Sequence, residues 1–354
     1  MRRGISLRIL TFLILWTGIF VLKKGEISAD EIVIQAVIFT VLVTVGLFIE
    51  RFFAFKGDIC LIPVVEAILA IGLVFLIRIK PEVAQTQFVW ANLGLICFYV
   101  ILFGIKDYRK LGEFKYLWGM AALGLLMITL VFGVTLGGAT SWIRIGSVGF
   151  EPEELVKVTL LLFLASYLKD NEEILRVGTV QVGKFSLPDK RTLGPFVITA
   201  IFVLGLLAAQ KSLGTAMVFF FLFVLLIYMV TERIIYLLMA IPMMVTTGIF
   251  GYMLFGHVRV RIATWINPWV DSTGTGFQIA QSIFAISGGK LLGTGLGNGI
   301  GAYQIPASST DFIFSVIAEE VGFAGAMAVI FLFIVVVMRA FAVSIRALDR
   351  FGQI

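Results

Sequence analysis

Long apolar runs of membrane-spanning length recur along almost the whole chain. They lie near residues 5–22, 32–49, 59–78, 88–106, 116–135, 153–168, 195–209, 213–230, 234–255 and 313–338. A helix needs about 20 apolar residues to cross a bilayer, and only helices or closed barrels satisfy their backbone groups in lipid. These runs are too continuous for barrel strands. The sequence therefore predicts an all-α fold, a polytopic transmembrane helix bundle of about ten spans.

The composition excludes a soluble domain. Hydrophobic residues make up 60% of the chain and charged residues only 14%, and a water-soluble fold has no way to cover so much apolar surface. The net charge of +6 is therefore better explained by orientation in a membrane than by an acidic or nucleic-acid partner. Arg2 and Arg3 precede the first run as in a signal peptide, but no small-residue cleavage site follows, so we expect an anchor helix.

Lysines and arginines are distributed unequally between the two sets of connecting segments. The richer set includes Arg2, Arg3, Arg8, Arg51 and the basic turn from Lys106 to Lys115, and the poorer set includes Arg78, Lys80, Arg259, Arg261 and Lys290. Connections rich in Lys and Arg stay in the cytoplasm. We therefore predict a cytoplasmic N-terminus and an outward-facing segment after the ninth run.

That outward segment, from Val258 to Gly322, is the only long polar stretch between strongly apolar ones. Loops of such length inside a compact fold are usually functional or disordered. Its aromatic residues and turn signals argue against disorder. We therefore expect the functional site on this loop.

The loop carries a series of short motifs in a fixed order. They are Arg259 and Arg261, Asn267-Pro268-Trp269-Val270-Asp271, Gly276-Phe277-Gln278, Gln281-Ser282, Gly288-Gly289-Lys290, glycines at every second position from Gly293 to Gly301, Pro306, Thr310-Asp311-Phe312-Ile313-Phe314, and Glu319-Glu320 with Gly322. This order resembles the signature of the shape, elongation, division and sporulation (SEDS) family, whose members include RodA, FtsW and SpoVE. The resemblance covers most of the chain from about Asp58 onward.

The resemblance also predicts the domain organisation. Residues 1–57, with two spans, are expected to be an N-terminal extension. Residues 58–354 are expected to form the SEDS-type transmembrane domain, including an extracytoplasmic loop at 256–312. Family members continue for two more helices, so we expect this chain to be a shortened member or an incomplete gene product.

Two further segments resemble family motifs but depart from them. The first resembles a Trp-Ile motif followed by Gln-Pro-Ser-Glu and a lysine, and consists of Trp142-Ile143, Glu151-Pro152-Glu153-Glu154 and Lys157. It departs from the motif because Glu151 and Glu153 replace Gln and Ser. In addition, Ser141 replaces the Arg before the Trp. Gln210-Lys211-Ser212-Leu213-Gly214-Thr215 resembles Gln-Pro-Asp-Leu-Gly-Thr, with Lys211 and Ser212 in place of Pro and Asp. Glu154 and Lys157 share a helix face and are expected to bind substrate at a cavity rim or to form a structural ion pair.

Glycosyl transfer from a lipid diphosphate needs a base for the acceptor hydroxyl and cations for the leaving diphosphate. Asp271 occupies the position of the family's catalytic aspartate after Asn-Pro-Trp, although an Asp before Ser272, Thr273 and Gly274 is also typical of a turn cap. Arg259, Arg261 and Lys290 are the candidate diphosphate partners. The other candidate substrate-binding residues are Gln278, Gln281, Asp311, Glu319 and Glu320. No strand precedes the glycine run, so it does not resemble a nucleotide loop.

The resemblance implies a peptidoglycan glycosyltransferase of the bacterial inner membrane that polymerises lipid II into glycan strands. It also implies a class B penicillin-binding transpeptidase as partner. A divalent cation is the one cofactor candidate, and no residue pattern assigns a metal site. Two alternatives stay open, a lipid II flippase and a catalytically silent scaffold of the cell-wall machinery. The sequence does not distinguish elongation, division and sporulation.

Overall fold

The computed structural model describes residues 2–23, 30–53, 55, 57–136, 138–146, 148–177, 180–182, 185–187 and 190–354. The chain divides into two compact units. Unit 1 contains Met1–Lys106 and Gly251–Ile345, and unit 2 contains Asp107–Phe250 and Arg346–Ile354. Nine of the described helices are long and apolar enough to cross a membrane. The expected helical membrane protein is thereby confirmed.

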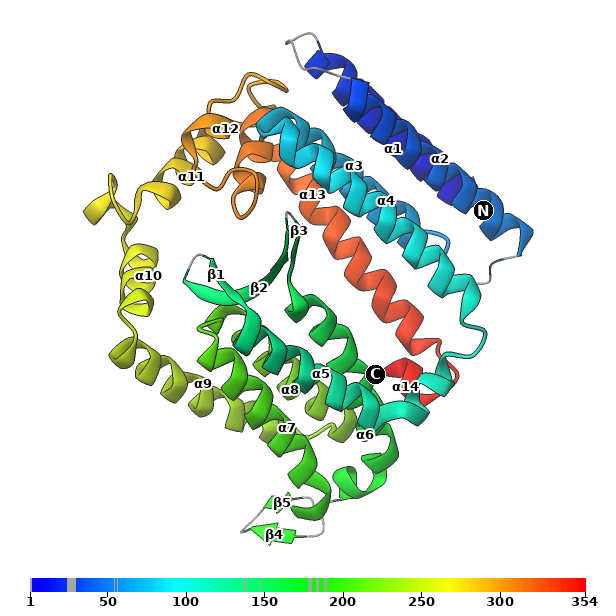
Figure 1. Ribbon diagram of the computed structural model, residues 1–354, viewed down its shortest axis with the longest axis vertical. Helices are drawn as coiled ribbons and strands as arrows, with labels where there is room; N and C mark the ends of the chain where they lie inside the picture. Colours follow the sequence, from blue (N-terminus) through cyan, green and yellow to red (C-terminus); the bar gives the residue numbers. More distant parts are fainter. Residues whose placement is uncertain are drawn as a thin grey trace. The chain divides into compact units, whose positions relative to one another are not determined.

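Unit 1 is built from helices at both ends of the chain. They are α1 (Arg2–Lys23), α2 (Asp30–Phe52), α3 (Leu61–Ile79), α4 (Pro81–Gly104), α10 (Gly256–Ile266), the 3-10 helix η2 (Pro268–Asp271), α11 (Phe277–Gly288), α12 (Gly301–Gln304) and α13 (Ile313–Ile345). Helix α3 packs against α1, α4 and α13, and α2 packs against α4 (Figure 1). Leu15, Phe39, Leu73 and Phe88 are fully buried or nearly so in the resulting core.

Unit 2 contains the middle of the chain. Its elements are η1 (Tyr108–Phe114), α5 (Lys115–Phe132), β1 (Val134–Leu136), β2 (Ala139–Ile145), β3 (Val148–Phe150), α6 (Pro152–Val177), β4 (Val180–Val182), β5 (Phe185–Leu187), α7 (Lys190–Ala209), α8 (Leu213–Thr231) and α14 (Arg350–Gln353). Helix α9 (Ile234–Leu254) runs from unit 2 into unit 1. Helix α6 packs against α5 and α8.

Two features of unit 2 differ from the sequence expectation. The apolar run near 153–168 is part of α6, which is not among the nine apolar spans. Both ends of this helix are charged, the first turns by Glu153, Glu154 and Lys157 and the last turns by Lys169, Asp170, Glu172, Glu173 and Arg176. Between α5 and α6, the all-α prediction missed a three-stranded antiparallel sheet in the order β1-β2-β3. Its turns use Gly138 and Gly146, whose positive φ angles of 91° and 65° suit glycine best.

The expected extracytoplasmic loop at 256–312 contains four helical elements, α10, η2, α11 and α12. Helix α11 is held by packing on α13, and Ala280, Ser282 and Ala285 are its buried residues. Helix α13 is interrupted at Gly322, where the backbone has φ 72° and ψ −175°. The segment is therefore a folded part of unit 1.

Replacing Gly322 with alanine is expected to destabilise unit 1. A Cβ at this position would lie 2.2 Å from the backbone nitrogen of Gly293, and the backbone conformation there is one that non-glycine residues rarely adopt. Thermal unfolding of the purified variant should begin several degrees lower, on the order of the 1–3 kcal/mol that such strain costs. Gly94→Ala is the matched control, because nothing lies within 4 Å of its Cβ position. Equal melting temperatures for the two variants would contradict the prediction.

Candidate functional site

Asp271 closes a tight turn at the surface of unit 1. It is the last residue of η2, which begins where Asn267 Oδ1 accepts the Trp269 amide at 3.1 Å. Its Oδ2 accepts the Thr275 amide at 2.7 Å and the Thr275 hydroxyl at 2.9 Å. These bonds hold the pKa of Asp271 below its usual value. Its exposed side chain is therefore ionised at neutral pH, and it also caps the turn as the alternative reading expected.

Helix α11 fixes this turn to α13. The hydroxyls of Ser282 and Ser315 are hydrogen bonded at 2.6 Å, and both residues are buried. At the other face of α11, the Phe284 ring contacts the ring of Trp269 with centroids 5.5 Å apart. The turn that carries Asp271 is thus attached to a packed helix pair.

The three candidate cations are exposed. Arg259 and Arg261 lie on α10, which carries no acidic residue, and Lys290 follows α11 with a positive φ of 49°. Among the described residues, none of the three has a carboxylate within ion-pair distance. Each is therefore available to an anionic ligand.

Glu319 and Glu320 are buried and bind the glycine run. Glu319 accepts the amides of Ile300 at 3.0 Å and Gly301 at 2.8 Å, and Glu320 accepts the amide of Gly297 at 2.9 Å. Successive backbone N–H groups of this kind form an anion-binding concavity, and here protein carboxylates fill it. The geometry thus gives both acids an internal role in holding the loop.

Arg78, at the end of α3, completes this assembly. Its guanidinium donates to Glu320 Oε1 at 3.2 Å, to the Tyr303 hydroxyl at 2.7 Å, and to the carbonyl oxygens of Gly297 and Gly299 at 2.8 and 3.1 Å. Sequence reasoning treated Arg78 only as a charge for the orientation count. The sequence did contain a signal for this contact. Arg78 is a basic residue between two predicted spans, and the adjacent acids Glu319 and Glu320 in a later span need a positive partner.

The remaining candidates of unit 1 have simpler surroundings. Gln278 and Gln281 are half-buried on α11, and Asp311 is exposed just before α13. The structure brings Gln278 and Gln281 onto the helix that follows the Asp271 turn. They are the polar side chains of α11 nearest to that turn in sequence.

Glu154 and Lys157 lie in unit 2, on the first turns of α6. Lys157 Nζ donates to Glu154 Oε1 at 2.7 Å, and both side chains are largely exposed. An exposed pair of this spacing contributes little to stability. Half-buried Glu151 precedes them, and its burial together with the charges of Glu153 and Glu154 raises the pKa of its carboxyl.

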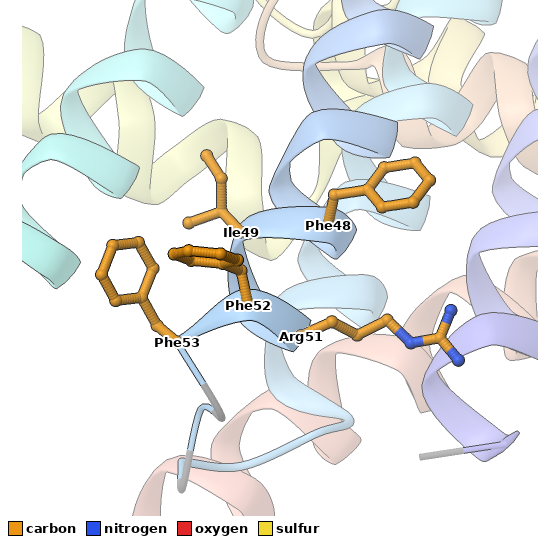
Figure 2. Close-up of a pocket in the computed structure, with 5 residues that line it drawn as sticks. All are labelled: Phe48, Ile49, Arg51, Phe52 and Phe53. Atoms are coloured by element: carbon orange, nitrogen blue, oxygen red, sulfur yellow. The ribbon is translucent and has the colours of Figure 1, made fainter.

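Two other features carry no chemistry. Among the described residues, no three His, Cys, Asp or Glu side chains gather as a metal site. Figure 2 shows an open apolar hollow at the end of α2, where Arg51 points away from Ile49, Phe52 and Phe53. It has no acid or hydroxyl among its lining residues and resembles a lipid-facing surface.

The apolar helices define a multi-pass membrane protein, and the folded segment between α9 and α13 gives it an exposed acid and exposed cations. A family model described as "Cell cycle protein", of FtsW, RodA and SpoVE, matches residues 60–354. The chain therefore belongs to the FtsW, RodA and SpoVE family.

Known relatives agree with this family. The chain is 31% identical over 317 residues to "Peptidoglycan glycosyltransferase RodA" of Mycobacterium tuberculosis. The aligned region covers 86% of this chain and 67% of the relative. It is 30% identical over 274 residues to "Stage V sporulation protein E" of Bacillus subtilis, covering 76% and 71%.

Solved structures share the fold. A chain of the structure "Structural coordination of polymerization and crosslinking by a peptidoglycan synthase complex" is 29% identical, with a TM-score of 0.65 over 84% of this chain and 81% of that one. The rod shape determining protein RodA of Thermus thermophilus is 25% identical, with a TM-score of 0.55 over 84% and 79%.

Proposed function

We propose that this chain is a peptidoglycan glycosyltransferase that polymerises lipid II into glycan strands during cell-wall synthesis. The family match and the relatives named as peptidoglycan glycosyltransferases support this activity. The structural observation that carries it is Asp271, an exposed ionised carboxylate on an ordered turn within the Asn-Pro-Trp-Val-Asp motif.

In the proposed reaction Asp271 is the general base. Its carboxylate removes the proton from the acceptor sugar hydroxyl as that oxygen attacks the anomeric carbon of the donor. A new C–O bond forms, and the bond to the lipid diphosphate breaks. The hydrogen bonds from Thr275 position the carboxylate through Oδ2. They leave Oδ1 for the sugar hydroxyl, which a general base must reach.

Arg259, Arg261 and Lys290 are the proposed partners of the diphosphate. Their exposure and lack of ion-pair partners among the described residues support this role. Cations near the leaving diphosphate stabilise the charge that develops on it. The guanidinium groups suit a phosphate better than an ammonium does, because they can donate two hydrogen bonds in parallel.

We also propose that the N-terminus is cytoplasmic and the segment from α10 to α12 extracytoplasmic, which follows from the Lys and Arg asymmetry. A class B penicillin-binding transpeptidase is the proposed partner. The similar chain from a structure concerned with polymerization and crosslinking supports such an assembly.

The orientation can be tested with single cysteines in a chain whose Cys60 and Cys97 are replaced by serine. Ser272→Cys and Lys110→Cys should react with an impermeant thiol reagent from opposite sides of the membrane. Ser272 follows η2 and Lys110 lies in η1, before α5 begins, and both are at least partly exposed. Labelling of both from the same side would contradict the proposed orientation.

The decisive experiment for the activity is polymerisation of purified lipid II by the purified chain, with and without a partner transpeptidase. Glycan strands are the expected product. Transfer of lipid II across proteoliposomes without polymer would favour the flippase alternative, and neither activity would favour the scaffold.

A further inference from the structure

Glu153 is a buried acid that lacks a cation. Only 1% of its surface is exposed, and its Oε2 accepts a hydrogen bond from the Ser212 hydroxyl at 3.2 Å. The Ser212 oxygen is also 3.0 Å from the Thr215 hydroxyl. No Lys or Arg side chain of the described residues pairs with Glu153. Burying an acid without a cation is costly unless a ligand or a hydrogen-bond network compensates it.

Two fully buried oxygen atoms in this region have no hydrogen-bond partner among the described residues. They are Oε1 of Glu153 and Oε1 of Gln210, which lies two residues before Ser212. The Gln210 amide nitrogen donates to the Leu126 carbonyl at 2.8 Å, which fixes its Oε1 as the acceptor. An ionised carboxylate oxygen and an amide oxygen are both acceptors, so each can take a donor or a cation. Buried acceptors without partners are rare and typically mark a site for a ligand, an ion or water.

The same two positions are those at which the sequence departs from the family motifs. Glu153 stands where the Gln-Pro-Ser-Glu motif has Ser, and Ser212 stands where the Gln-Pro-Asp-Leu-Gly-Thr motif has Asp. The structure brings these residues into direct hydrogen-bond contact. In this chain the acid of the pair lies on α6 and the hydroxyl belongs to the residue just before α8.

We propose that Glu153 and Ser212 form an exchanged acid–hydroxyl pair, and that Oε1 of Glu153 receives a positively polarised group, either a divalent cation or an O–H or N–H donor of the lipid-linked substrate. The inference rests on the proposed glycosyltransferase function. Ser212 orients the carboxylate through Oε2. The positive N-terminal end of α6 favours the charge, because Glu153 lies in the first turn of a 26-residue helix.

The exchange can be tested by four variants assayed for strand synthesis at equal amounts of folded protein. Glu153→Ser removes the acid, and Ser212→Asp places two carboxylates in contact, so each should lower the rate about tenfold or more, as expected for hydrogen bonds to a charged group. The double variant has one acid and one hydroxyl again and should recover to within about threefold of the parent. Glu173→Gln, an exposed acid on the same helix, is the control and should be unaffected. A double variant as impaired as the singles would overturn the proposal.

Glu153→Gln separates ligand binding from packing. The oxygen of the amide can still accept from Ser212, but its nitrogen cannot accept a second donor as Oε1 can. If Glu153 only packs and binds Ser212, the variant should therefore polymerise at the parent rate. We expect at least a tenfold higher Mg²⁺ concentration for half-maximal rate if the ligand is a cation, or a similarly raised KM for lipid II if the substrate supplies the donor. Unchanged rate, KM and Mg²⁺ requirement would overturn the proposal.

The outcome can be distinguished from a failure of the proposed function. If the parent makes no polymer, binding of lipid II and of Mg²⁺ to the parent and to Glu153→Gln is measured without turnover. Weaker binding of either by the variant supports the site independently of catalysis. Equal binding of both rejects it.

Discussion

Asp271→Asn is expected to reduce strand synthesis at least about a hundredfold, because a positioned general base typically contributes about 10²–10⁴-fold. The amide keeps the size of the side chain and an oxygen that can accept from Thr275, so the turn should remain intact. It cannot take a proton from the sugar hydroxyl. Membrane insertion, melting temperature and lipid II binding should therefore match the parent, while the polymerisation rate falls.

Glu82→Gln is the matched control for this variant. Glu82 is an exposed acid at the start of α4, outside the candidate site, and its amide variant should polymerise at the parent rate. The hydrogen bonds from Thr275 lower the pKa of Asp271. Its carboxylate therefore stays ionised as the pH falls through the usual pKa of an aspartate, and activity due to this group is lost only at more acidic pH. A parent-like rate for Asp271→Asn would show that the base lies elsewhere.

Arg8→Met is expected to be the most destabilising of the substitutions discussed. Arg8 is 3% exposed, and both edges of its guanidinium are bound. One edge donates to Glu66 at 2.7 and 3.1 Å, and the other donates to Glu50 at 2.9 and 2.7 Å. The Tyr99 hydroxyl lies 3.1 Å from Glu66. Removing the cation leaves two carboxylates without their partner, which costs about 3–5 kcal/mol for a buried pair.

The measurement is thermal unfolding of the purified full chain in detergent, together with its fraction of monodisperse protein. Arg51→Gln is the control, because Arg51 is exposed and directly follows Glu50 at the C-terminal end of α2. Adding Glu50→Gln and Glu66→Gln to Arg8→Met should restore part of the lost stability, since the loss comes from the orphaned acids. A melting temperature equal to that of the parent would contradict this account of the cluster.

The Arg8 cluster also bears on the proposed domain organisation. Arg8 and Glu50 precede residue 60, where the family match begins, whereas Glu66 and Tyr99 lie within it. Residues 1–57 remain a proposed extension, but its two helices share a charged core with α3 and α4. We therefore propose that the extension is an integral part of unit 1.

The long apolar runs were sufficient to predict most of the helices. Unpaired backbone groups are so costly in lipid that few structures other than a helix are open to such runs. The motif order was likewise sufficient to indicate the family, which the family match confirms. The same reasoning failed for β1, β2 and β3, whose short segments lie outside the spans where that constraint does not act. It also missed the helices of the segment after α9, because they are short and depend on tertiary contacts, such as those of α11 and α12 with α13.

The tertiary structure alone decided the surroundings of the charged residues. The sequence analysis counted Arg8 and Arg78 only for the orientation and named Glu319 and Glu320 as candidate substrate-binding residues. Whether a side chain meets water, a ligand or an opposite charge depends on contacts with residues far away in the chain. Arg78 meets Glu320, and Glu153 meets Ser212. Burial makes such contacts obligatory, because a buried charge without a partner costs several kcal/mol. That requirement is physical, yet it becomes visible only when the helices are packed together.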